Sequence, residues 1–64
     1  MTIYDKVKEL ADNAGISIAA LEAKAKVANG TISGWKKGRP YAKTLKKVAD
    51  ALNVTIDEVM EGVT

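Results

Sequence analysis

The sequence has 64 residues, 47% of them hydrophobic, a formal net charge of +2, and neither cysteine nor histidine. This length fits a single small domain spanning 1–64, and the composition indicates a folded chain rather than a disordered one. Disulfides, thiolate zinc sites and imidazole chemistry are excluded, so we expect no metal, no cofactor and no enzyme. The sequence has neither an apolar run of about 18 residues nor a signal-peptide core, which predicts a cytoplasmic protein.

Positive charge is concentrated in the middle of the chain. The stretch 24–47 has no acidic residue, and its basic residues are Lys24, Lys26, Lys36, Lys37, Arg39, Lys43, Lys46 and Lys47. Every acidic residue lies outside that stretch, where the only other basic residues are Lys6 and Lys8. A basic middle between acidic ends is the distribution that a phosphate-facing surface needs.

Hydrophobic spacing predicts five helices and no strand. A first helix begins near Ile3 and ends at Gly15, which is the expected left-handed cap. Ser17 is a good N-cap for a second helix, because its hydroxyl can satisfy an unpaired backbone amide. That second helix is expected to run to about residue 24 and to be followed by a turn at 25–27.

A third helix is expected over about 29–37, with Ile32 and Trp35 buried. Together with the second helix and the turn, it makes a helix-turn-helix, whose second helix lies in the major groove of DNA. Pro40 then interrupts the helical pattern, because it lacks an amide donor. The remaining elements are a fourth helix over 42–52, closed by Asn53, and a fifth that starts with the capping-box spacing of Thr55 and Glu58 and ends at Gly62.

The order of these features resembles one protein family. It reads Gly-Ile-Ser-(x)3-Leu from Gly15, Val-(x)4-Ile-Ser-x-Trp-(x)2-Gly from Val27, and Leu-(x)2-Val-Ala-x-Ala-Leu-x-Val-(x)4-Val-Met from Leu45. This order is similar to the Cro/CI-type phage repressor domains of the XRE family over almost the whole chain. The stretch Gly-Thr-Ile-Ser-Gly-Trp-Lys-Lys looks most like small prophage repressors of Gram-positive bacteria. The resemblance implies an all-α, compact five-helix bundle of the lambda-repressor-like type that binds double-stranded operator DNA and represses or switches transcription.

The resemblance also implies that the first exposed residues of the third helix touch base edges. The base-contacting residues expected here are Asn29, Gly30, Thr31, Ser33 and Gly34. Asn29 is the best candidate, because its amide can bond adenine N6 and N7 together; the alternative is that it caps the third helix. The two glycines either let the helix approach DNA closely or, for Gly34, merely weaken it. Both alternatives predict modest direct readout, with phosphate contacts and DNA shape carrying much of the binding.

Phosphate contacts are expected from the edges of the motif. By resemblance and by charge, the residues are Ser17, Lys37, Arg39, Tyr41, Lys43 and Thr44. Ser17 lies where free amides at the start of the second helix favour a phosphate. Tyr41 could equally cover the core under the loop, and Lys46 and Lys47 fit the solvated face of the fourth helix better than a DNA contact.

The sequence departs from the family pattern at several positions. Ile18 replaces a glutamine that often contacts phosphate, and Lys26 takes the turn position usually held by glycine, where positive φ costs roughly 1 kcal/mol. Glu22 replaces a small residue. Many members pair an arginine late in the first helix with a glutamate late in the third, but Ala11 and Lys36 stand there. A substitute pair between Glu22 and Lys36 is one hypothesis.

Oligomerisation is expected through the C-terminal helix. Its apolar residues exceed what one short helix needs for core packing, and the predicted patch is Val59, Met60 and Val63, with ordinary core or a frayed tail as the alternative. A patch this small implies a weak homodimer that forms on DNA, on half-sites about one turn apart. The length leaves no room for a ligand-sensing domain, so no small-molecule ligand is expected, unless the chain is one domain of a longer regulator.

The main alternative function is a protein–protein interaction module on the same fold, such as an antitoxin-like or anti-repressor partner. The two functions differ in salt dependence, because DNA binding should weaken steeply as salt rises. Membrane-surface binding is disfavoured, because the basic stretch is not one amphipathic helix. RNA binding lacks the stacking aromatics that it usually requires.

Overall fold

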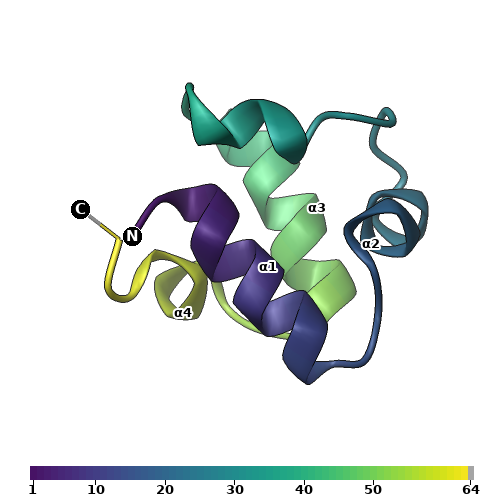
Figure 1. Ribbon diagram of the computed structural model, residues 1–64, viewed down its shortest axis with the longest axis horizontal. Helices are drawn as coiled ribbons and strands as arrows, with labels where there is room; N and C mark the ends of the chain where they lie inside the picture. The colour runs from purple at the N-terminus through teal and green to yellow at the C-terminus, as the bar shows by residue number, and fades with distance from the viewer. Residues whose placement is uncertain (64) are drawn as a thin grey trace.

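The computed structural model describes residues 1–63, and over that range the fold is entirely helical (Figure 1). Its elements are the α-helices α1 (Ile3–Asn13), α2 (Ile18–Ala25), α3 (Ala42–Leu52) and α4 (Ile56–Met60), with the 3₁₀-helix η1 (Ser33–Lys36) between α2 and α3. The all-α prediction is confirmed, but the described chain has four α-helices rather than five.

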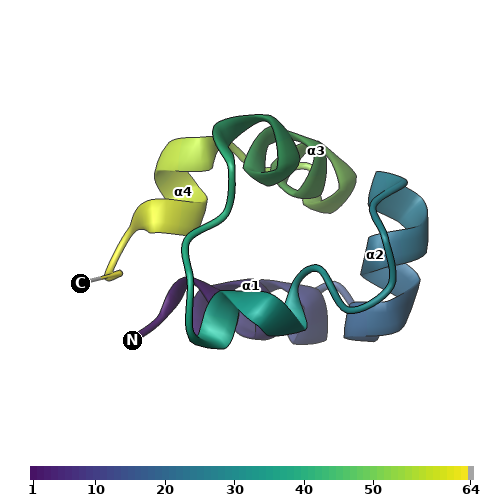
Figure 2. The ribbon, with the colours of Figure 1, turned by 90° about the horizontal axis from the view of Figure 1, so that it is seen from above.

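The helices pack in two layers. Helix η1 packs against α1, α2 packs against α3, and α4 contacts both α1 and α3. Seen from above, α1 and η1 lie on one side, α3 and α4 on the other, and α2 covers one end (Figure 2). The N-terminus and the end of the described chain lie close together at the opposite end. The largest fully buried side chains of the core are Leu21, Ile32, Val7, Val48 and Val59.

Side-chain caps begin the first two helices. The Ser17 hydroxyl accepts a hydrogen bond from the backbone N–H of Ala20 at 3.0 Å, which confirms the predicted cap of α2. Thr2 and Asp5 form a complete capping box at the start of α1: each backbone N–H donates to the side chain of the other residue, at 3.1 Å. This box was not anticipated, although its threonine and carboxylate have the required spacing.

Three predicted turn residues adopt the left-handed conformation. Gly15 has φ of +76°, Lys26 has φ of +61° and Asn53 has φ of +62°. Glycine and asparagine enter this region at low cost, but a lysine pays the steric penalty of its Cβ. Lys26 is therefore a strained position in the turn after α2.

Replacing Lys26 with glycine should stabilise the domain. We expect Lys26→Gly to raise the free energy of unfolding by about 0.5–1 kcal/mol, because glycine relieves the left-handed strain. Lys24→Gly is the matched control, since Lys24 is exposed inside α2 and loses helix propensity instead, at a cost of roughly 1 kcal/mol. Urea denaturation of both variants should give shifts of opposite sign, and a loss of stability in Lys26→Gly would contradict the strain.

The largest difference from the predicted fold is the expected third α-helix over 29–37. Only Ser33–Lys36 is helical there, as a 3₁₀-helix, and residues 29–32 form turns. Gly30 has φ of +91°, which an α-helix cannot contain, and the neighbouring Thr31 and Ile32 are β-branched. The prediction of Gly30 as a helical residue was therefore wrong. Asn29 caps no helix either, because η1 begins only at Ser33 and has no side-chain cap.

Candidate nucleic-acid interface

Residues 29–36, which comprise the turns and η1, have exposed polar residues on the outer side and two buried apolar side chains that pack into the core. Ile32 is fully buried and Trp35 is 6% exposed, as predicted, so these two side chains fix the segment to the core. The predicted base-contacting residues Asn29, Gly30, Ser33 and Gly34 are all exposed, and Thr31 is half-buried. A methyl group built onto Gly34 would meet no atom within 4 Å, so this glycine lies on the open outer side of η1.

Glu22 holds the first half of the 29–36 segment in place. Its side chain is 3% exposed. Its carboxylate accepts hydrogen bonds from the backbone N–H of Gly30, at 3.1 and 3.2 Å, and from that of Ile32, at 2.9 Å. The ion pairs among the described residues are Lys8–Asp12 and Lys46–Asp50, and neither includes Glu22. Backbone amides rather than a cation therefore compensate for the burial of this carboxylate.

The proposed pair between Glu22 and Lys36 is therefore wrong. Lys36 instead places its ammonium nitrogen 4.7 Å from the centre of the Tyr4 ring, a cation–π contact that joins η1 to α1. Tyr4 is half-buried on α1 and was not identified from the sequence. The only available signal was an aromatic residue beside the apolar face of the first helix, and that signal does not specify a partner in η1.

The predicted phosphate-contacting residues lie on three neighbouring parts of the fold. Lys37 and Arg39 follow η1, Tyr41, Lys43 and Thr44 lie at the start of α3, and Ser17 begins α2. All are exposed except Thr44, which is half-buried. Tyr41 is 84% exposed, so the alternative that it covers the core is wrong.

A surface hollow of about 570 Å³ borders these cations. It lies between the N-terminal end of the chain, the segment after η1 and the end of the described chain. Lys36, Lys37 and Arg39 line it together with apolar side chains that include Trp35 and Met60, and no acidic residue lines it. The ion pairs among residues 1–63 join Lys8 to Asp12 and Lys46 to Asp50, so within that range no acidic side chain pairs with the cations around this hollow.

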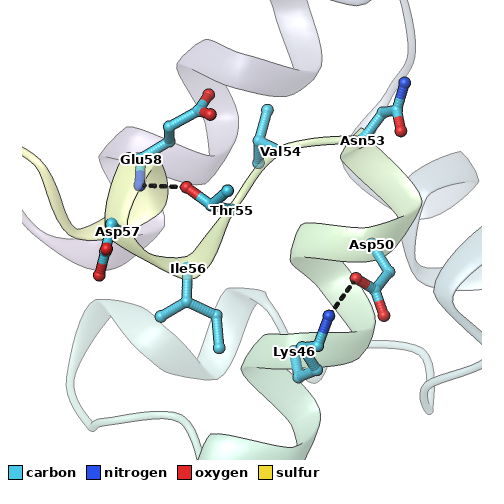
Figure 3. A pocket seen from close by; sticks show the side chains of 8 residues that line it. All are labelled: Lys46, Asp50, Asn53, Val54, Thr55, Ile56, Asp57 and Glu58. Atoms are coloured by element: carbon cyan, nitrogen blue, oxygen red, sulfur yellow. Dashed lines mark hydrogen bonds and ion pairs between the residues drawn. The ribbon is translucent and has the colours of Figure 1, made fainter.

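A second hollow, of about 510 Å³, lies between the end of α3 and the start of α4 (Figure 3). Lys46 there places its ammonium nitrogen 2.6 Å from an Asp50 carboxylate oxygen, which fits a solvated face of α3. Thr55 accepts the backbone N–H of Glu58 at 3.1 Å; among the described contacts, this half of the predicted capping box is the one that forms. Residues 1–63 contain no group of three or more side chains that could hold a metal ion.

The predicted dimer patch is only partly on the surface. Val59 is fully buried in the core, so its inclusion in the patch was wrong. Its position in a five-residue helix that contacts both α1 and α3 explains the burial. Met60 is 41% exposed and Val63 is half-buried. These two residues remain as a predicted contact surface.

Helix α2, the turn at Lys26 and the segment 29–36 have the chain order of a helix-turn-helix motif, with exposed cations beside it. A family model described as "Helix-turn-helix" matches residues 7–59 of the chain. The match covers most of the sequence, and the chain belongs to the XRE helix-turn-helix family. It is therefore a domain of the DNA-binding, transcription-regulating type. No curated protein matches the chain. None of the helices within 1–63 is long and apolar enough to cross a membrane.

Proposed function

We propose that this chain is a sequence-specific, repressor-type transcriptional regulator of the prophage kind that binds double-stranded operator DNA. The 29–36 segment enters the major groove, and the cations at Lys37, Arg39 and Lys43 hold the flanking phosphates. The supporting observation is that four of the five base-contacting candidates are exposed beside cations that no acid of the described chain neutralises. Such a protein acts in the cytoplasm, at the nucleoid.

The shape of the segment favours limited base readout. A 3₁₀-helix is narrower than an α-helix, and Gly34 on its outer side adds no bulk, so the backbone can approach the groove floor closely. Asn29 and Ser33 are the exposed side chains with hydrogen-bonding groups that can reach base edges. Most of the affinity then comes from phosphate contacts, and DNA shape contributes to sequence preference.

Selection of bound duplexes from a randomised DNA pool at moderate salt tests this function. We expect enrichment of a two-fold symmetric site with half-sites about one helical turn apart. Asn29→Ala should relax the preference at one base position by about 1–3 kcal/mol, whereas Arg39→Ala should weaken binding evenly across sequences. If a folded protein enriches no site, the proposed function fails. An interaction module that receives an acidic segment in the hollow lined by Lys36, Lys37 and Arg39 would then be the better account.

Weak dimerisation on DNA is the second part of the proposal. The exposed part of Met60 and the neighbouring Val63 offer a small apolar contact, too small for a stable dimer in free solution. We expect Met60→Ser, which removes the apolar contact without adding charge beside Lys37 and Arg39, to lower affinity for a duplex with two half-sites by about tenfold, while binding to one half-site changes little. Gel-shift titrations on the two duplexes measure this difference, and an equal loss on both would contradict the dimer.

A further inference from the structure

Glu22 lies on α2 but makes its hydrogen bonds far along the chain. The two amides that it binds belong to Gly30 and Ile32, eight and ten residues later. These two amides flank Thr31, and that of Gly30 follows directly after Asn29, so the carboxylate holds the backbone that carries these two base-contacting candidates. Ile32 is anchored in the core, but residues 29–32 form turns outside any helix, so no helical hydrogen-bond pattern fixes the backbone of Asn29 and Gly30 before it.

We propose that Glu22 is a positioning residue for DNA recognition. Its buried carboxylate sets the backbone course of residues 29–32, and through it the direction in which the exposed Asn29, and Ser33 directly after Ile32, are presented to the bases. This inference rests on the proposed DNA-binding function. It assigns Glu22 an effect on DNA that comes from geometry rather than from contact, since the side chain is 3% exposed.

Removing the charge of Glu22 distinguishes a positioning role from a purely electrostatic effect on DNA affinity. A carboxylate near a phosphate-binding surface repels DNA, so removing it should tighten binding if charge alone mattered. Removing it should weaken binding if the carboxylate orders the segment, because a disordered segment must be ordered again at the expense of affinity. The two roles therefore predict changes of opposite sign.

The test uses Glu22→Ala, Glu22→Gln and a core variant, Val59→Ala. Val59 is fully buried in α4, so its truncation destabilises the domain from a site outside the 29–36 segment. All proteins are compared at a temperature where each is folded by circular dichroism, on one duplex taken from the pool selection. Amide hydrogen exchange of Gly30 and Ile32 is measured without DNA, relative to the amide of Val48 in the same variant, which corrects for global stability.

We expect Glu22→Ala to lose at least about tenfold in DNA affinity, while Val59→Ala changes by less than about twofold. Glu22→Gln keeps one carbonyl oxygen as an acceptor and should recover part of the loss. The exchange rates of the Gly30 and Ile32 amides, each divided by that of the Val48 amide, should rise at least about tenfold in Glu22→Ala. Unchanged or tighter binding by folded Glu22→Ala, or an equal loss in Val59→Ala, would overturn the proposal. If the wild-type protein binds no duplex, the proposed function fails, and an unchanged exchange ratio would separately overturn the role of Glu22 in ordering the segment.

Discussion

Truncating Ile32 to alanine should unfold a large fraction of the protein. Ile32 is fully buried and anchors the 29–36 segment to the core. Buried isoleucine-to-alanine changes cost about 2–5 kcal/mol, from the lost transfer free energy and the cavity that remains. A 64-residue domain has little stability beyond that amount, because one small core rarely supplies more than about 3–5 kcal/mol. Thermal unfolding followed by circular dichroism should show the variant partly unfolded at 37 °C.

Two further variants distinguish core anchoring from a general sensitivity to mutation. Ile32→Val removes a single methylene and should cost only about 0.5–1.5 kcal/mol. Met60→Ala truncates a side chain that is 41% exposed and should cost less than about 1 kcal/mol. If Ile32→Ala were as stable as Met60→Ala, the segment would not be anchored through Ile32.

Neutralising the three flanking cations should have the largest effect on DNA binding. The association constant K falls as salt rises, so a plot of log K against log salt has a negative slope. We expect the triple change Lys37→Gln, Arg39→Gln and Lys43→Gln to make that slope shallower by about 2.7, or about 0.9 per lost phosphate contact. Extrapolated from 1 M salt, that change in slope corresponds to an affinity loss of about 500-fold at 0.1 M salt. Fluorescence-anisotropy titrations at several salt concentrations measure both quantities.

The control for this triple change removes the same charge from other places. Lys8 and Lys46 are paired with carboxylates within their own helices, and Lys47 is exposed on α3. Changing these three lysines to glutamine should alter the salt slope by about half a unit at most, because none is expected to touch phosphate. Equal losses in the two triple variants would indicate diffuse attraction between protein and DNA rather than a docked face.

Local features of this fold could be predicted from the sequence, because short-range rules decide them. The Ser17 cap, the Gly15 turn and the left-handed Lys26 each depend on a few adjacent residues, and each was predicted correctly. The burial of Ile32 and Trp35 was also predicted, because a three-residue step between apolar side chains favours the same face in both kinds of helix.

The features that could not be predicted depend on contacts between distant residues. Glu22 was identified as a departure from the family pattern, but charge suggested a lysine partner, whereas the structure gives it two backbone amides. Those bonds and the positive φ of Gly30 together replace the expected first turn of the third helix. Val59 and Met60 show the same limit, since only the packing of α4 decides which of the two is buried.

Titration of ¹⁵N-labelled protein with a selected duplex tests the central claim most directly. If the 29–36 segment binds the major groove, the largest amide shifts should fall on residues 29–39, with smaller ones at Ser17 and at the start of α3. The amides around the hollow between α3 and α4 should change little. Shifts centred on that hollow or on the outer face of α1, with residues 29–39 unaffected, would contradict DNA recognition by this segment.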